Sequence, residues 1–245
     1  MTSSHRITAV IPARYGSTRF PGKPLAEIKN KPMIQWVYEK AVNAGNIDNV
    51  IVATDDERIS DAVKAFGGNA VLTSADHQTG SDRIAEAVQD LDCDIVINLQ
   101  GDEPLIPSEV IDNLANVMIE EKCPMATVAV PFSCTTSEPD DPNAVKVVTG
   151  SDDYALYFSR SLIPCQRDPG EDCYQPLLHW GIYGYRKEFL QKFVTWKQGK
   201  LERTEKLEQL RALENGASIK VIKVQTPTRG VDTPEDLQTI ENLIN

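Results

Sequence analysis

The first half of the chain alternates short apolar runs with amphipathic segments. The apolar runs predict buried strands at 7–11, 49–54, 70–72 and 94–99. Between these runs, apolar residues recur at helical spacing and predict helices at 32–44, 55–66, 84–91 and 110–118. Strands that alternate with amphipathic helices are typical of an α/β fold in which a mainly parallel sheet carries helices on both faces.

The pattern changes after about residue 125. Four strand-like runs follow without clear helices between them, at 125–131, 144–149, 154–159 and 181–185. A helix is then predicted at 200–214 and a strand at 219–224, and the last helix begins with Thr233 as its N-cap and Pro234 in its first turn. We predict a single domain over residues 1–245, with a β-rich insertion at approximately 125–186.

Composition excludes several classes of protein. A net charge of −11 opposes nonspecific binding to nucleic acid or to an anionic membrane. The sequence has no apolar leader at its start and no stretch of about 18 apolar residues, so we expect a cytoplasmic protein. Its five cysteines include no Cys-x-x-Cys pair, which predicts reduced thiols rather than a zinc site or a disulfide framework.

The segment that follows the first strand is the most unusual in the chain. Residues 11–25 contain three prolines and two glycines, which interrupt any regular helix or strand. The same segment carries four polar side chains that suit an anion: Arg14, Ser17, Arg19 and Lys23. Arginine forks onto phosphate oxygens, and glycine lets the backbone approach a ligand closely. We interpret this loop as a polyphosphate cradle; the alternative is a solvated basic surface loop.

Two familiar nucleotide-binding loops do not fit this segment. A Walker A loop would place Gly-Lys-Ser/Thr at the start of a helix, and the dinucleotide turn would read Gly-x-Gly-x-x-Gly. The absence of that glycine fingerprint after the first strand argues against a dinucleotide oxidoreductase.

Three further segments are expected beside this loop, because ligands of open α/β sheets bind beyond the carboxyl ends of the strands. Asp102 follows the strand at 94–99, and Asp232 precedes the last helix, so both could hold Mg²⁺ on a nucleotide's phosphates. Arg83 lies near a helix start, where the dipole disfavours a cation, which suggests an anionic ligand nearby. Each residue also has a simpler interpretation. Asp102 could be an acidic residue in a turn that serves the next helix, Asp232 could only cap the last helix, and Arg83 could be a solvated side chain.

The second half adds weaker candidates. His179 and Tyr183 lie at alternate positions of a predicted strand, and a lone histidine there is more often structural than catalytic. Glu208 and Gln209 lie at the edge of the predicted 200–214 helix, for which a solvated helix face is the alternative.

Residues 14–25, RYGSTRFPGKPL, resemble the nucleotide-binding signature of sugar cytidylyltransferases. More narrowly, they resemble the 3-deoxy-manno-octulosonate cytidylyltransferases, the CMP-Kdo synthetases of bacterial lipopolysaccharide synthesis. The resemblance runs nearly from end to end and includes QGDEP at 100–104, GIYGYR at 181–186, LEQLR at 207–211 and GVDTPEDL at 230–237.

The resemblance implies a Rossmann-like nucleotidyltransferase fold and a homodimer built on the β-rich insertion. It implies that CTP contacts Arg14, Ser17, Arg19, Lys23 and Gln100, with Asp102 and Asp232 as the Mg²⁺ ligands and Lys23 as a catalytic partner. It further implies a sugar-acid pocket that contains Arg83, Gln100, His179, Tyr183, Glu208 and Gln209.

Two segments depart from the family pattern. Residues 199–205 lack the usual Ser-Pro, and residues 164–178 are short and lack the usual aromatic after the proline. Both flank the expected sugar pocket, so the substrate could be Kdo or its 8-amino analogue, with Thr204 as a candidate partner of the amine. A cytidylyltransferase for another sugar acid, or a regulator with an inactive site, is an alternative; such a regulator would lose Lys23, Asp102 or Asp232.

Overall fold

The main sheet of the computed structural model has nine strands within the residues that the structure describes, which are 5–16, 20–135, 137–168, 174–226 and 230–244. Seven of them follow the order β11-β7-β10-β6-β1-β4-β5, while β8 and β9 branch from β10. The strands are β1 (Ile7–Ala13), β4 (Asn49–Thr54), β5 (Ala70–Leu72), β6 (Ile95–Asn98), β7 (Met125–Pro131), β8 (Lys146–Thr149), β9 (Ala155–Ser159), β10 (Leu177–Arg186) and β11 (Ile219–Lys223). A separate hairpin joins β2 (Glu27–Ile28) to β3 (Lys31–Pro32).

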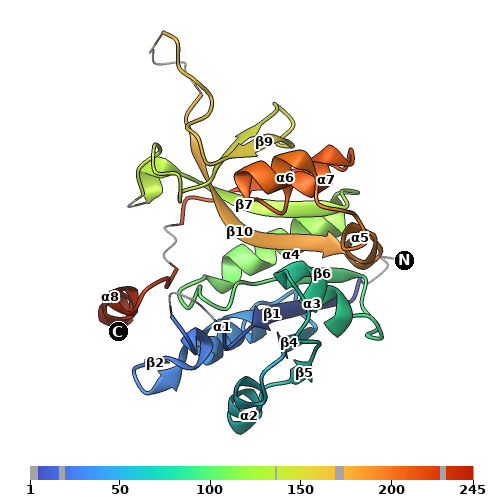
Figure 1. The fold of residues 1–245 in the computed structure, drawn as a ribbon, viewed down its shortest axis with the longest axis vertical. Coiled ribbons are helices and arrows are strands. Elements are labelled where there is room, and N and C mark those ends of the chain that lie inside the picture. Colours follow the sequence, from blue (N-terminus) through green and yellow to red (C-terminus); the bar gives the residue numbers. More distant parts are fainter. Residues whose placement is uncertain (1–4, 17–19, 136, 169–173, 227–229, 245) are drawn as a thin grey trace.

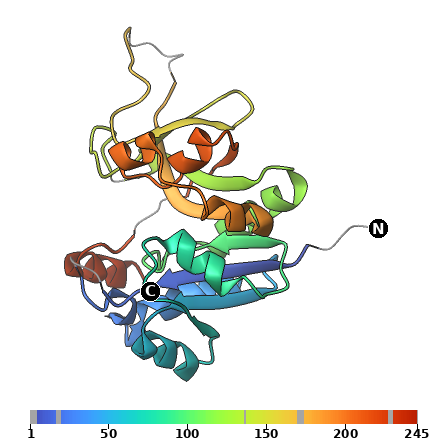
Figure 2. The same ribbon diagram turned by 45° about the vertical axis from the view of Figure 1, so that its right-hand side comes forward.

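Helices cover both faces of this sheet (Figures 1 and 2). The α-helices are α1 (Met33–Val42), α2 (Glu57–Ala65), α3 (Gly80–Ala87), α4 (Ser108–Glu120), α5 (Lys187–Phe193), α6 (Lys200–Glu205), α7 (Leu210–Glu214) and α8 (Pro234–Leu243). The predicted α/β fold with helices on both faces is confirmed, and no helix among the described residues is both long enough and apolar enough to cross a membrane.

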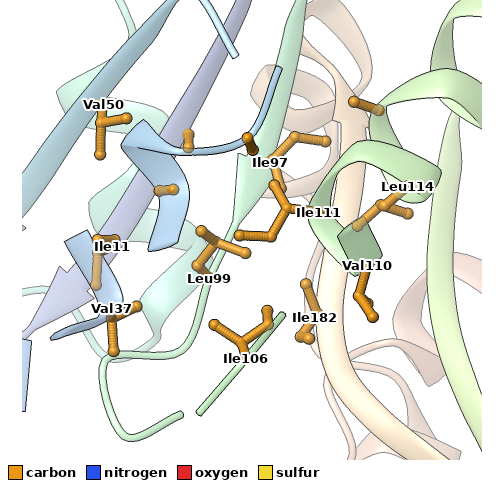
Figure 3. Packing of buried hydrophobic residues seen from close by; sticks show 14 of the residues in the cluster. Ile11, Val37, Val50, Ile97, Leu99, Ile106, Val110, Ile111, Leu114 and Ile182 are labelled. Atoms are coloured by element: carbon orange, nitrogen blue, oxygen red, sulfur yellow. The ribbon is translucent and has the colours of Figure 1, made fainter. Parts of the chain in front are cut away.

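The two faces of β1 explain why the sheet has two cores. Ile7, Ala9 and Ile11 point to one core with α1, α2 and α4, whereas Val10 points to the other with α3 and α5. Figure 3 shows the first core, in which side chains of α1 and α4 pack against side chains of the sheet. Burial on both faces is the reason that these strands read as continuous apolar runs.

Strand β1 continues two residues beyond the predicted stop at Ile11. Pro12 lies opposite Ala53 of β4, but the pairing of β1 with β6 ends at Val10. Pro12 therefore lies where β1 has a neighbour on one side only, a position at which a strand tolerates a residue without an N–H group.

The section from 125 to 186 is largely part of the main sheet. Strand β10 is antiparallel to both β6 and β7, and β7 is parallel to β11. The β8–β9 pair branches from β10, toward the top of Figure 1. Strand β1 is parallel to both of its neighbours, β4 and β6, whereas β10 is antiparallel to both β6 and β7.

The prediction of one helix over 200–214 was wrong. Lys206 adopts a left-handed backbone, with φ of 56°, and separates α6 from α7. Leu201 on α6 is 40% exposed, whereas Gln209, for which a solvated helix face was the alternative, is buried. The break rotates the second segment so that Gln209 and Arg211 enter the core.

Candidate active site

The loop after β1 brings Lys23 to two carboxylates from distant parts of the chain. Its Nζ donates to Asp102 Oδ2 at 2.6 Å and to the carbonyl of Val231 at 2.8 Å, and it lies 3.6 Å from Asp232 Oδ1. Gly22, with φ of 72°, turns the chain into the short 3₁₀ helix Lys23–Leu25 that positions this lysine. The predicted convergence of the first loop with the two acidic segments is therefore observed.

Backbone contacts hold the two acidic segments together without the lysine. The N–H of Val231 donates to the carbonyl of Asp102 at 2.9 Å, and the N–H of Asp232 donates to Asp236 Oδ2 at 3.0 Å. Asp236 also closes the capping box with Thr233 at the start of α8. The capping alternative thus applies to Asp236, and it leaves the carboxylate of Asp232 available for other partners.

Three neighbouring cavities lie beyond the carboxyl ends of β1 and β6. The first, of about 210 Å³, is lined by Arg14, Gln100 and Arg83; the second, of about 220 Å³, shares Arg14 and Gln100 and adds Lys23 and Asp102. The third, of about 410 Å³, contains both acids and His179, and its other polar lining residues include Asp141 and Asn143. Because β1 and β6 are parallel, the segments that follow them meet at the same edge of the sheet.

Arg83 is buried, so the solvated alternative for this residue was wrong. It is 4% exposed, and its guanidinium donates to Thr73 Oγ1 at 2.5 Å and lies 3.1 Å from Asp55 Oδ2. The two acids before α2 have different partners: Asp56 accepts the N–H of Arg58, while Asp55 pairs with Arg83. Asp55 therefore positions the arginine at the wall of the first cavity.

His179 is a neutral, hydrogen-bonded residue that also lines the third cavity. The Thr127 hydroxyl donates to the Ile182 carbonyl at 2.7 Å and lies 3.1 Å from His179 Nε2. The Thr127 hydroxyl has only one proton, and the Ile182 carbonyl accepts it, so the hydroxyl oxygen must accept the hydrogen bond from His179. The imidazole is therefore protonated on Nε2, and this N–H donates to the Thr127 oxygen. Burial lowers the pKa of His179 to about 3, so the ring is uncharged at neutral pH.

Glu208 and Tyr183 lie behind α3, away from the acids. Glu208 accepts the hydroxyl of Ser81 at 2.9 Å, and burial raises the pKa of its carboxyl group. Burial also raises the pKa of the phenol of Tyr183, a residue whose backbone is paired with Asn98 in the β6–β10 register. Neither residue is among those that line the three cavities described above, so the structure does not group them with Lys23.

Gln209 is buried, and its amide nitrogen has no hydrogen-bond partner within the described part of the chain. A buried amide without a partner is costly, so this donor is available to a ligand or a water molecule.

Part of the first loop falls outside the described residues, including Ser17 and Arg19, which were predicted to bind phosphate. The flank of the loop is held by Tyr15, whose ring packs 3.4 Å beneath the guanidinium of Arg58 and whose carbonyl accepts the N–H of Gly22. A side chain at position 22 would meet the Tyr15 ring at 3.1 Å. These contacts fix both ends of the loop.

Comparison with known proteins identifies the family of the chain. Residues 8–221 match the family model described as Cytidylyltransferase.

The chain belongs to the cytidylyltransferase family.

Cytidylyl transfer is a form of nucleotidyl transfer, so the prediction of a nucleotidyltransferase is confirmed.

Individual relatives of the chain have more specific names than the family. The chain is 52% identical to the 3-deoxy-manno-octulosonate cytidylyltransferase of Photobacterium profundum, over 97% of this chain and 98% of the relative. It is also 52% identical to the protein of that name from Syntrophobacter fumaroxidans, over 96% and 95%. A solved CMP:2-keto-3-deoxy-manno-octonic acid synthetase in complex with CTP is 43% identical, with a TM-score of 0.91 and 98% of each chain covered. The resemblance inferred from the motifs is confirmed.

The hypothesis that Thr204 is a partner of a sugar amine stays a prediction. In this cytidylyltransferase Thr204 is exposed on α6, and its hydroxyl donates to the carbonyl of Lys200 at 2.8 Å. It lines none of the three cavities. The hydroxyl satisfies its own helix because the break at Lys206 turns only the later segment inward.

Sequence reasoning missed several residues that shape the cytidylyltransferase site. Asp141 and Asn143 reach the third cavity from a loop with no periodic pattern, and the Val231 carbonyl is a backbone group. Asp55 was detectable, because an acid directly after a buried strand occupies a strand end. Pairing it with Arg83 required the tertiary structure.

The imidazole of His179 should make the cytidylyltransferase less stable in mild acid. The pKa of this group is about 3 in the folded protein, whereas its ordinary value is 6.5. Between these values the unfolded chain binds the proton, so stability falls as the pH drops below about 6.5, by on the order of 2 kcal/mol at pH 5. Urea unfolding at pH 7 and pH 5 should show a smaller loss for His179→Gln than for the wild type. An NMR titration that placed the His179 midpoint near 6.5 would contradict this expectation.

Proposed function

We propose that the protein transfers CMP from CTP to the anomeric hydroxyl of 3-deoxy-manno-octulosonate and releases pyrophosphate, as a step in lipopolysaccharide biosynthesis. The observation that carries the proposal is the cluster of Lys23, Asp102 and Asp232 at the edge of the sheet, in a chain that matches relatives of that name along nearly its whole length. The cytoplasmic location predicted from the sequence stays a prediction, and the four described cysteines are free thiols, which suits a reducing compartment.

The nucleotide would lie along the first and second cavities. Arg14 and Gln100 line both of them, and Lys23 lines the second, so cationic and amide groups follow one path beside the carboxyl end of β1. Ser17 and Arg19 complete the proposed contacts from outside the described residues. A local concentration of cations is required because the protein as a whole carries a charge of −11.

Asp102 and Asp232 fit a divalent cation, which we propose to be Mg²⁺. The ammonium group of Lys23 already lies between them, at 2.6 Å and 3.6 Å, so the two carboxylates converge on a position suited to positive charge. Among the described residues, no three His, Cys, Asp or Glu side chains gather as a closed metal cage. Mg²⁺ commonly binds through one or two carboxylates together with phosphate oxygens and water.

The chain's own groups would act by positioning and by charge. The sugar hydroxyl attacks the α-phosphorus in line and loses its proton to solvent, while the bond from that phosphorus to the bridging oxygen breaks and pyrophosphate leaves with the electron pair. Arg14 and Lys23 would hold the phosphates and stabilise the negative charge that develops on them. When bound, Mg²⁺ supplies Lewis-acid polarisation of the phosphoryl oxygens.

The sugar acid would lie between Gln100 and the β10 strand. We propose that Arg83, Gln100, His179, Tyr183, Glu208 and Gln209 form this subsite. Arg83 supplies a buried cation for the sugar's carboxylate, although Asp55 already balances part of its charge. The unpartnered amide of Gln209 supplies a donor for a sugar hydroxyl.

A single assay tests the reaction and its substrate. CTP-dependent release of pyrophosphate is measured with Kdo and with its 8-amino analogue, side by side, and with each of the other nucleoside triphosphates. Release that requires CTP and Kdo supports the proposal. A preference for the 8-amino sugar would select the alternative substrate and direct mutagenesis to the departures at 164–178 and 199–205. No release with CTP and either sugar would overturn it.

We also propose that the protein is a homodimer that uses the outlying β8–β9 pair. Leu156 on β9 is 66% exposed, and Leu162, just beyond the same strand, is 48% exposed. Large exposed apolar side chains close together mark surfaces that other chains cover.

Leu156→Glu should therefore weaken the dimer by about 100-fold or more, equivalent to ~2.7 kcal/mol, because a charge would be buried at the interface. Light scattering after gel filtration measures the mass. The matched control is Val42→Glu, which alters a comparably exposed side chain on α1. A wild-type protein that remains monomeric at high concentration would refute the dimer.

A further inference from the structure

Lys23 occupies the place between the two acids that a metal ion would need. Its ammonium group is 2.6 Å from Asp102 and 3.6 Å from Asp232, and a third bond of 2.8 Å to the Val231 carbonyl fixes it there. The Lys23 side chain is only 18% exposed. The lysine is thus a well-held internal cation rather than a flexible surface group.

The position of the lysine creates a conflict with its proposed role toward phosphate. An ammonium bound to Asp102 cannot at the same time give all of its donors to a triphosphate, and a divalent ion beside it would be repelled by its charge. Both ligands of Lys23 in the free enzyme are groups that lie next to the proposed metal position. One of the two cations must therefore move when the other arrives.

The acids themselves do not depend on the lysine for their placement. The bond from the Val231 N–H to the Asp102 carbonyl and the bond from the Asp232 N–H to Asp236 involve no atom of Lys23. Gly230 allows this close approach, because a side chain there would meet Glu103 at 3.2 Å and the Asp102 carbonyl at 3.5 Å. The carboxylate pair is therefore preformed.

The two acids also differ in accessibility. The side chain of Asp232 is 72% exposed, whereas that of Asp102 is 32% exposed and carries the shorter bond to Lys23. A hydrated ion can approach Asp232 from solvent, whereas Oδ2 of Asp102 is already bound by the ammonium group.

We propose that Lys23 is a resident cation that keeps the metal position closed until the triphosphate draws the ammonium group onto its oxygens. The inference rests on the proposed function. It makes Lys23 the residue that couples the two ligands: CTP moves the lysine, and the vacated carboxylates then accept the divalent ion. Metal and nucleotide consequently bind with positive cooperativity, and the free enzyme binds the metal weakly.

Mn²⁺ binding, followed by the electron paramagnetic resonance signal of the free ion, tests this coupling without any turnover. In the absence of nucleotide, Lys23→Met should bind Mn²⁺ at least about tenfold more tightly than the wild type, because the two acids lose their internal cation. Addition of CTP should tighten Mn²⁺ binding by a larger factor in the wild type than in Lys23→Met. Lys23→Gln, which keeps a polar side chain, should behave like Lys23→Met, and circular dichroism checks that both variants are folded.

The matched control is Lys31→Met. Lys31 also pairs with a carboxylate, Glu39, at 2.7 Å, so its removal changes the net charge equally at a different place. Its Mn²⁺ affinity should stay within about twofold of the wild type, and Asp102→Asn should abolish the tight binding of Lys23→Met.

The outcomes separate this inference from the function on which it rests. If CTP promotes Asp102-dependent Mn²⁺ binding in the wild type but Lys23→Met gains no affinity without nucleotide, the resident-cation role is overturned and the metal site stands. If no Asp102-dependent Mn²⁺ binding occurs even with CTP, the proposed metal site fails and the inference fails with it.

Discussion

Asp102→Asn should lower kcat by at least about 10³-fold. The asparagine keeps the size of the side chain but removes the charge that Lys23 contacts at 2.6 Å and that the proposed Mg²⁺ requires. Because Asp102 is close to the leaving phosphates in the proposed reaction, the loss is expected mainly in kcat rather than in the KM for CTP. Pyrophosphate release with saturating CTP and Kdo measures it.

The control for this variant is Asp61→Asn, which removes an exposed carboxylate from α2 and should leave the rate unchanged. Thermal unfolding of both variants establishes that the fold is retained. An Asp102→Asn enzyme with more than a tenth of the wild-type kcat would show that this carboxylate is not required, and would remove the metal assignment from the proposed function.

Arg211→Met should destabilise the fold by about 3–5 kcal/mol, because it leaves a buried carboxylate without its partner. Arg211 binds Glu202 through two hydrogen bonds, of 2.9 Å and 2.6 Å, and both side chains are at most 5% exposed. The guanidinium also lies 4.9 Å from the ring centre of Phe193, so the pair joins α6 and α7 to α5. The free energy of unfolding in urea, followed by circular dichroism and fluorescence together, measures the change.

Two controls separate burial from charge. The double variant Glu202→Met/Arg211→Met should recover most of the lost stability, since apolar residues can replace a buried ion pair with little net cost. Lys223→Met breaks a surface pair with Asp153, at 2.6 Å, and should cost less than about 1 kcal/mol. A cost for Arg211→Met as small as that of Lys223→Met would mean that the buried pair does not hold this region.

The same pair bears on the site, because Arg211 also approaches Glu208, at 3.4 Å. Glu208 and Gln209 lie in the short connection between α6 and α7. The ion pair between Glu202 and Arg211 joins the two helices that flank this connection. In the proposed function, the two residues reach the sugar pocket only because Arg211 and Glu202 fix the helices on either side.

The order of strands and helices in the first half could be predicted because each element is specified locally. Strands β1, β4 and β6 are buried on both faces, so their sequences are apolar without interruption, and the helices between them show one apolar face. The start of α8 could also be predicted from the sequence, since its capping box consists of neighbouring residues. The first loop stood out because its prolines, glycines and cations serve neither a strand nor a helix.

The second half resisted prediction where long-range contacts override local pattern. The break at Lys206 has no glycine or proline to mark it, although the left-handed backbone there is followed by the buried residues Gln209 and Arg211. Similarly, β10 resembles an outlying strand in sequence, yet it lies at the centre of the sheet because β6 and β7 both pair with it.

The sequence by itself determined the fold class, the family and the three segments that carry the acids and the lysine, because these depend on local periodicity and on short motifs. Only the tertiary structure decided which partners these side chains have. It buried Arg83 against Asp55, gave His179 a neutral ring and placed Lys23 between Asp102 and Asp232. Each of these outcomes depends on a contact between residues far apart in the chain or on the polarity of the surroundings in the folded protein. The spacing of residues along one segment determines neither the contact nor the polarity.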